Sequence, residues 1–138
     1  MRRFQFLPLV LVWMLAGCGS GSAGWTPLPS GVEPPANCAR AGADDVIEIS
    51  AHDSRFNAPC MAGPPGVALV VRFTNNDSDQ HNVVIYSSRS KSKELMRGET
   101  TTGPQVTKDY AVKALPAGEY YFECLIHPGD MNGALYVR

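Results

Sequence analysis

The sequence predicts an all-β protein, built as a β-sandwich of seven to eight short strands. Short segments rich in Val, Ile, Tyr and Phe alternate with turn clusters of Gly, Pro, Asn and Asp. No segment of consequence has the period of a helix. The globular part has about 100 residues, which is enough for one sandwich-sized core and too few for two domains.

The N-terminus has the features of a signal peptide. Two arginines precede an apolar run over Phe4–Leu15, which is shorter than the roughly 20 residues of a membrane-spanning helix. The run ends in Leu15-Ala16-Gly17-Cys18, which resembles a bacterial lipobox. We therefore expect residues 1–17 to be a lipoprotein signal peptide and Cys18 to be lipidated. An ordinary cleavage site beside a chance cysteine is the alternative.

Residues 18–37 are rich in Gly, Ser and Pro and are predicted to form a flexible tether with a mean reach on the order of 25 Å. The predicted domain then covers residues 38–138. We expect it to be exported and held to a bacterial membrane by the N-terminal lipid, in the periplasm or the extracellular space. The formal net charge of −1 gives no indication of nucleic-acid binding.

Cys38 and Cys60 remain after Cys18 is assigned to the lipid and Cys124 to the motif described below. An exported chain permits disulfides. This pair would close a loop of about 22 residues, worth about 3 kcal/mol on the chain-entropy model. A disulfide is favoured, and a buried thiol or a metal ligand at Cys60 stays open.

The elements follow in order from alternation and breakers. Residues 46–51 alternate weakly and open the sheet, and a short bent strand is expected between the breakers 57–59 and 63–66. Further strands are expected over residues 67–73, 81–86, 106–112, 119–124 and 133–138. Residues 87–99 are hydrophilic, and we expect a long connection there with one helical turn around 93–97. Its basic residues could steer an acidic partner, although a solvated loop is favoured.

The strand over 119–124 has a clean period of two. Tyr120, Phe122 and Cys124 therefore share one face, and Tyr121 and Glu123 share the other. If the first face is the core, the Cys124 thiol lies inside the top of the sandwich. Tyr120 could also hold the preceding corner through its hydroxyl.

Four side chains are candidate metal ligands. Cys124, His127 and Met131 lie within eight residues, and His81 heads an earlier strand. A thiolate and two imidazoles in a plane, with a weak axial thioether, are the ligands of a blue-copper site. Zinc fits less well because methionine is a poor zinc ligand. His52 has no partner in the motif and is expected on the surface. Cys-x-x-Cys patterns for disulfide exchange or covalent haem are absent from the sequence.

The motif His81-Asn82, followed by Pro116 to Pro128 and by Met131-Asn132-Gly133, resembles the cupredoxins, the small blue-copper proteins of plastocyanin and amicyanin type. The resemblance covers residues 45–138. It implies a Greek-key sandwich holding one type 1 copper, with His81, Cys124 and His127 as equatorial ligands and Met131 as axial ligand. Three residues separate His127 from Met131, more than in amicyanin-like loops and fewer than in plastocyanin-like loops. Asn82 is expected to hydrogen-bond across to the cysteine loop.

The predicted function is electron transfer. The chain would carry one electron between redox partner proteins outside the cytoplasm, through an apolar patch around Leu125, Ile126, Pro128 and Met131. It is not expected to be an enzyme or to take a small-molecule substrate, because its three histidines cannot supply the further copper sites of a multicopper enzyme. Two alternatives are a copper chaperone that donates copper to a cuproenzyme, and a sandwich module that has lost its metal role.

Overall fold

The computed structural model describes residues 33–138. The predicted signal peptide, the predicted lipidation site Cys18 and most of the predicted tether lie outside these residues. Within them the chain is all β, which confirms the predicted fold class. It has twelve strands, four of which contain only two residues. The described part contains no helix that could span a membrane.

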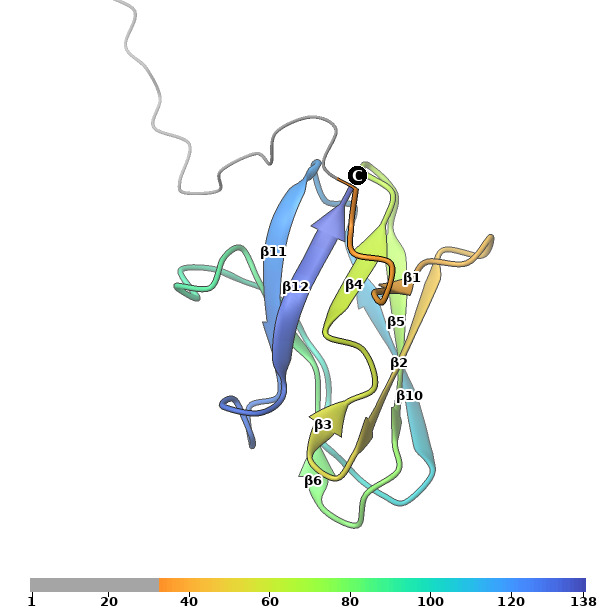
Figure 1. Ribbon diagram of the computed structural model, residues 1–138, viewed down its shortest axis with the longest axis vertical. Helices are drawn as coiled ribbons and strands as arrows, with labels where there is room; N and C mark the ends of the chain where they lie inside the picture. Colours follow the sequence, from red (N-terminus) through yellow and green to blue (C-terminus); the bar gives the residue numbers. More distant parts are fainter. Residues whose placement is uncertain (1–32) are drawn as a thin grey trace, which may run out of the picture.

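Two sheets pack face to face as a sandwich, and Figure 1 shows both layers. The larger sheet has the order β1-β4-β12-β11-β7-β8. The smaller sheet has the order β10-β5-β2-β3. A small ribbon pairs β6 with β9. The strands of the larger sheet are β1 (Ala39–Arg40), β4 (Cys60–Gly63), β12 (Asn132–Val137), β11 (Gly118–Glu123), β7 (Val84–Tyr86) and β8 (Glu94–Arg97). The others are β10 (Val106–Val112), β5 (Leu69–Asn75), β2 (Val46–His52), β3 (Arg55–Phe56), β6 (Gln80–His81) and β9 (Thr101–Thr102).

The core lies where alternating side chains of the two layers meet. Strand β5 alternates between buried and half-buried residues along its whole length. It pairs in parallel with β2 and antiparallel with β10, so that Val71 lies beside Ile47 and Tyr110. From the opposite sheet, Phe122 and Leu135 reach the same core and are fully buried. This packing holds the end of β11, and with it Cys124, in a fixed place.

The strand expected over residues 81–86 is divided between two sheets. β6 ends at His81 and pairs with β9, whereas β7 begins at Val84 and pairs with β11 and β8. Between them the Asn82 side chain donates to the Gly98 carbonyl (3.2 Å) and accepts from the Leu125 N–H (3.0 Å). These bonds lie outside the strand ladders, so the chain bends where the sequence predicts one straight strand.

The helical turn expected around residues 93–97 is wrong. This segment is strand β8, which pairs antiparallel with β7 through an irregularity at Ile85 and Tyr86. The edge of β7 supplies hydrogen-bond partners that a hydrophilic segment can use at the border of a sheet. Met96 faces inward and joins the core, while Glu94 and Arg97 stay exposed. Pairing with the preceding strand β7 therefore decided the structure of this segment.

The expected Tyr120 hydrogen bond and the expected disulfide are both present. The Tyr120 hydroxyl donates to the Pro116 carbonyl (2.8 Å) and holds the corner before β11. Cys38 and Cys60 form a disulfide with a Cα–Cα distance of 4.5 Å. It ties the residue before the two-residue strand β1 to β4 at the border of the larger sheet.

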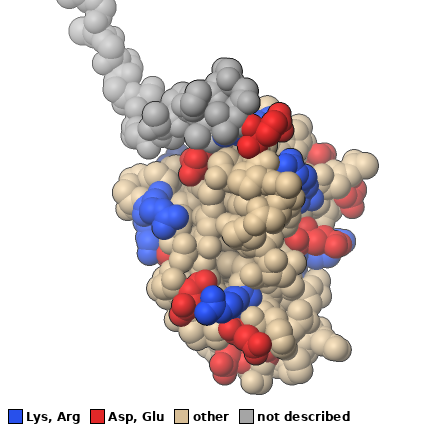
Figure 2. Space-filling view, in the orientation of Figure 1, with Lys and Arg blue, Asp and Glu red and all other residues tan. Residues whose placement is uncertain are grey.

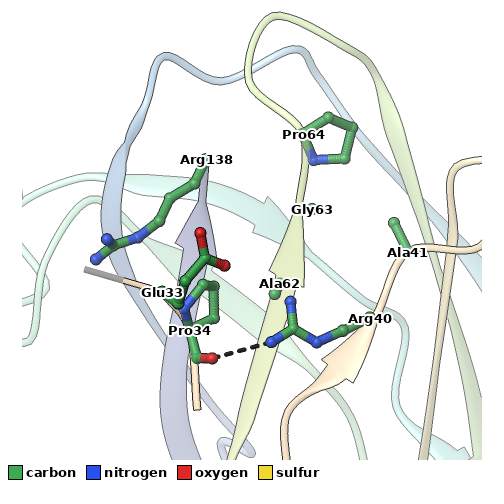
Figure 3. A pocket seen from close by; sticks show the side chains of 8 residues that line it. All are labelled: Glu33, Pro34, Arg40, Ala41, Ala62, Gly63, Pro64 and Arg138. Carbon is green, nitrogen blue, oxygen red and sulfur yellow. Dashed lines mark hydrogen bonds between the residues drawn. The ribbon is translucent and has the colours of Figure 1, made fainter. Parts of the chain in front are cut away.

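The described chain begins and ends at the same end of the sandwich. Glu33 and Pro34 lie beside Arg138, and the Arg40 guanidinium donates to the Pro34 carbonyl (2.9 Å; Figure 3). Strand β6 and the loop before β12 lie toward the other end (Figure 1). Acidic and basic side chains are interspersed on the face drawn in Figure 2. The start of the described chain and strand β6 therefore lie at opposite ends of the sandwich.

Candidate metal centre

Three donor atoms from separate parts of the chain converge at the end of the sandwich formed by β6 and the loop before β12. Nδ1 of His81 lies 3.2 Å from Nδ1 of His127 and 3.8 Å from Sγ of Cys124. All three donor atoms lie within 4.8 Å of one another. His81 and Cys124 are fully buried, whereas His127 is half-buried. The structure thus brings together the three residues that the sequence predicts as equatorial ligands.

The loop from Cys124 to Met131 is closed by its own backbone. The Cys124 N–H donates to the Met131 carbonyl, and the Met131 N–H donates to the His127 carbonyl, both at 2.9 Å. The Asn132 amide donates to the Pro128 carbonyl (2.9 Å) and fastens the far side of the loop. Met131 is fully buried and packs in the same core cluster as Cys124. The three residues between His127 and Met131 therefore form one compact turn.

Asn82 makes the contact expected of it. Its Oδ1 accepts from the N–H of Leu125, the residue that follows the cysteine, at 3.0 Å. Asn82 is itself 1% exposed, so this hydrogen bond is shielded from water. The segment that carries His81 is thereby joined to the loop that carries Cys124.

Asp77 is a residue of the site that sequence reasoning missed. Its Oδ2 lies 2.8 Å from Nε2 of His81, on the side of the ring away from the donor cluster. Burial raises the pKa of Asp77, but the N–H groups of Ser54 and Asp53 and the His81 ring together lower it below its usual value. The available signal was an acidic residue four positions before the histidine. The turn between these residues brings the Asp77 carboxylate to the His81 ring, and the sequence pattern does not determine the path of that turn.

The donor set fits a metal ion by its own chemistry. An ionised carboxylate only accepts hydrogen bonds, so the proton of the His81 ring belongs on Nε2 and the lone pair on Nδ1. That lone pair faces a second imidazole nitrogen 3.2 Å away and a sulfur 3.8 Å away. An ion about 2.0–2.1 Å from each imidazole nitrogen can lie between atoms at this separation. Two imidazoles, a thiol and a buried thioether are the donor types that suit copper.

His52 lies outside this cluster, as expected. Its side chain is 72% exposed, and its ring nitrogens lie 3.6 Å from carboxylate oxygens of Asp53 and Asp77. These three residues form a second, open group of donors. Both Asp77 oxygens already accept hydrogen bonds from other groups, so the geometry favours the buried cluster.

The outer face of β11 carries a cluster that the sequence did not reveal. Glu123 precedes Cys124, is 2% exposed and binds Nζ of Lys91 (2.8 Å) and the hydroxyl of Tyr121 (3.1 Å). The Arg89 guanidinium lies over the Tyr121 ring, 4.9 Å from its centroid. The hydrogen bond that Lys91 donates to the Glu123 carboxylate is the main cause that raises the pKa of Lys91. The segment between β7 and β8, which carries Arg89 and Lys91, thus packs on β11, the strand that ends at the metal centre.

Comparisons with known proteins agree with this geometry. The sequence matches the family described as a cupredoxin-like domain over residues 9–137. None of the curated proteins matches the chain. Auracyanin A, a "blue" copper protein of the green thermophilic photosynthetic bacterium Chloroflexus aurantiacus, superposes with a TM-score of 0.60 at 21% identity, over 67% of this chain and 98% of its own.

Two further solved structures have the same fold. Auracyanin from Roseiflexus castenholzii has a TM-score of 0.56 at 22% identity, over 70% of this chain and 99% of its own. Amicyanin from Paracoccus versutus has a TM-score of 0.52 at 27% identity, over 70% of this chain and 84% of its own. The sandwich therefore has the same architecture as these proteins over 84% to 99% of their length.

Proposed function

Because the chain belongs to the cupredoxin-like domain family, we propose that it is a type 1 copper protein that carries one electron between redox partners outside the cytoplasm. The observation that carries this proposal is the convergence of His81 Nδ1, Cys124 Sγ and His127 Nδ1 beside the buried Met131. His81, Cys124 and His127 would hold one copper ion as strong ligands, and the Met131 thioether would be a weaker fourth donor. The solved relative auracyanin A is itself described as a blue copper protein.

The copper supplies a one-electron couple between Cu(II) and Cu(I). The residues of this chain supply a rigid and dry setting for it. His81, Cys124 and Met131 are fully buried, so water has little access to their donor atoms. The hydrogen bonds across the loop and from Asn82 keep the donor atoms from moving apart. A donor set held in this way changes little between oxidation states, as a fast electron carrier needs.

Partner proteins would approach at the loop end of the sandwich. Leu125 and Ile126 are 38% and 41% exposed, the exposed large hydrophobic residues of the described chain. They directly precede the half-buried His127, which is the most exposed residue of the donor set. An apolar surface around one ligand suits brief docking of another redox protein. The chain needs no binding site for a small-molecule substrate and catalyses no reaction in this role.

The proposed location rests on the sequence outside the described residues. Cleavage after residue 17 and lipidation of Cys18 would leave the domain on a tether at a bacterial membrane, in the periplasm or the extracellular space. The described chain is consistent with export because it contains a disulfide.

The test is the visible spectrum of the purified chain from residue 33 to 138 after addition of Cu(II). Cys124 is the free cysteine of this segment. An intense thiolate-to-copper band that bleaches on reduction and returns on oxidation is expected, and Cys124→Ser should abolish it. His127→Ala should also lose the band, whereas the matched variant His52→Ala should keep it because His52 lies outside the donor cluster.

Two other results would change the assignment. Copper that a mild chelator removes at once from the wild-type chain would favour the alternative role, delivery of copper to a cuproenzyme. Absence of copper binding to the folded domain would contradict both roles and leave a sandwich module.

A further inference from the structure

Asp77 connects the metal centre to a hairpin turn on the opposite sheet. Its carboxylate lies 2.8 Å from His81 Nε2, and its side chain is only 12% exposed. The same carboxylate accepts hydrogen bonds from the N–H groups of Asp53 (2.8 Å) and Ser54 (3.0 Å). These two residues form the turn between β2 and β3. One side chain therefore joins a proposed ligand to a second element of the fold.

The turn holds the carboxylate firmly. Asp53 and Ser54 have φ angles of 50° and 54°, the left-handed pair typical of a tight two-residue hairpin. Both donors belong to the backbone, so they cannot rotate away unless the hairpin opens. On the other side, the Asp77 N–H donates to Oδ1 of the fully buried Asn75 (2.9 Å). Asp77 is thus held by two backbone N–H groups and by a buried side chain, and none of these can move freely.

A fixed carboxylate at Nε2 has two consequences for His81. It keeps the proton on Nε2, which leaves the Nδ1 lone pair directed at the donor cluster. It also sets the orientation of the ring and makes its other nitrogen a stronger donor to a cation, because a negative charge at the N–H favours a positive charge at the metal. The second effect favours Cu(II) over Cu(I).

We infer that Asp77 is a positioning residue for the metal centre, which fixes the tautomer of His81 and lowers the reduction potential of the bound ion. This inference rests on the proposed function. It assigns a role in tuning that centre to a residue outside the ligand motif and to the β2–β3 turn that holds it.

The first test uses the full chain without metal, so it is independent of copper binding. Nitrogen NMR of the imidazole rings should show His81 with its proton on Nε2, and the N–H signal should be protected from exchange with water. In Asp77→Asn the protection should be lost, because the amide cannot accept from the ring and from both backbone N–H groups together. A wild-type His81 with its proton on Nδ1 would overturn the inference.

The second test compares reduction potentials of the copper-loaded full chain. Loss of such a partner typically weakens metal affinity by about 10-fold or more. If that loss falls on Cu(II), the potential of Asp77→Asn rises by about 59 mV for a one-electron couple. Asp79→Asn is the matched control, since it removes an exposed carboxylate from the same turn and leaves the hydrogen bond to His81 intact. Equal potentials for the two variants would contradict the inference.

The outcomes separate the two proposals. If the wild-type chain binds no copper, the proposed function fails, while the metal-free NMR result still shows whether Asp77 sets the His81 tautomer. If copper binds with its thiolate band but the potential of Asp77→Asn does not exceed that of Asp79→Asn, only the role of Asp77 fails. Circular dichroism of each variant establishes that it is folded before these values are compared.

Discussion

Among the proposed copper ligands, Met131 is the one whose role rests on its side-chain sulfur alone. Its backbone is fixed twice, by the N–H of Cys124 and by the carbonyl of His127, and its side chain is buried with Cys124. Those contacts would persist with any apolar residue of the same size. The sulfur atom is therefore what a substitution at this position tests.

We expect Met131→Leu to keep the fold and the copper but to change the centre. The swap nearly conserves volume, so the free energy of unfolding of the metal-free chain should fall by less than about 1.5 kcal/mol. Loss of a weak axial donor should raise the reduction potential and alter the electron paramagnetic resonance spectrum of Cu(II). An unchanged spectrum and potential would exclude Met131 as a ligand.

Tyr110 offers a residue-scale prediction away from the metal. Its hydroxyl donates to the Glu99 carbonyl (2.6 Å), and burial, with a smaller effect of the Glu99 charge, raises its pKa to about 12. Because the folded pKa exceeds the usual value of 10.0, Tyr110 contributes stability below pH 10 that is lost as the pH rises toward 12.

The measurement is tyrosinate absorbance against pH for the wild-type chain and for Tyr110→Phe. The difference between the two curves should rise near pH 12 and not near pH 10. The variant should also lose about 1 kcal/mol of unfolding free energy at neutral pH, since one hydrogen bond is removed. A difference curve centred near pH 10 would show that the phenol is not shielded.

At the scale of single elements, strands with a strict period were predictable, and strands set by contacts outside their own segment were not. β10 spans the predicted residues 106–112, and β11 and β12 differ from prediction by one residue at each end. In β12 the alternation matches the buried face, whereas both faces of β11 are buried from Tyr120 onward. The division between β6 and β7 depends on the hydrogen bonds of Asn82, and β8 depends on pairing with one edge of β7. Neither contact produces a recognisable pattern in the sequence of these segments.

The same division applies to the site. The proposed ligands were predictable because donor types and spacing are written in the sequence. Asp77 and the Glu123–Lys91 pair were not, because a turn path and a loop fold bring them into contact. Residues that supply donors are thus more visible in a sequence than residues that orient them.

The disulfide lies at the edge of the larger sheet, and we expect its removal to change only the free energy of unfolding. β1 has two residues and depends on β4 and on the Cys38–Cys60 link for its place. Replacing both cysteines by alanine should lower the free energy of unfolding by about 3 kcal/mol on the chain-entropy model. Urea unfolding curves of the variant and the wild-type chain measure this loss.

The copper spectrum is the control for that variant. The donor cluster lies toward the other end of the sandwich, beyond the core, so the thiolate band should keep its position and intensity (Figure 1). A shifted band would mean that the border strand supports the metal centre, contrary to the arrangement of the two ends.

For the whole molecule, that arrangement predicts an orientation at the membrane. The described chain starts beside Arg138, whereas β6 and the Cys124–Met131 loop lie toward the opposite end (Figure 1). A domain of about 100 residues has a radius of gyration near 13 Å, so its two ends are separated by a distance similar to the mean reach of the predicted tether, on the order of 25 Å. If Cys18 carries the lipid, the attached end should lie nearer the bilayer on average, and the exposed Leu125 and Ile126 should face outward toward partner proteins.

Fluorescent labels at the two ends test this orientation in the lipidated chain on vesicles. Asp130→Cys places a label on the exposed loop at the metal end, and Pro65→Cys places one at an exposed position near the attached end. A quencher carried on lipid headgroups should reduce the emission at position 65 more than at position 130. Chains without the lipid, mixed with the same vesicles, should show little quenching at either position. Equal quenching at both positions in the lipidated chain would mean that the tether lets the domain tumble freely, and stronger quenching at position 130 would mean that the apolar loop end inserts into the bilayer instead of meeting a protein.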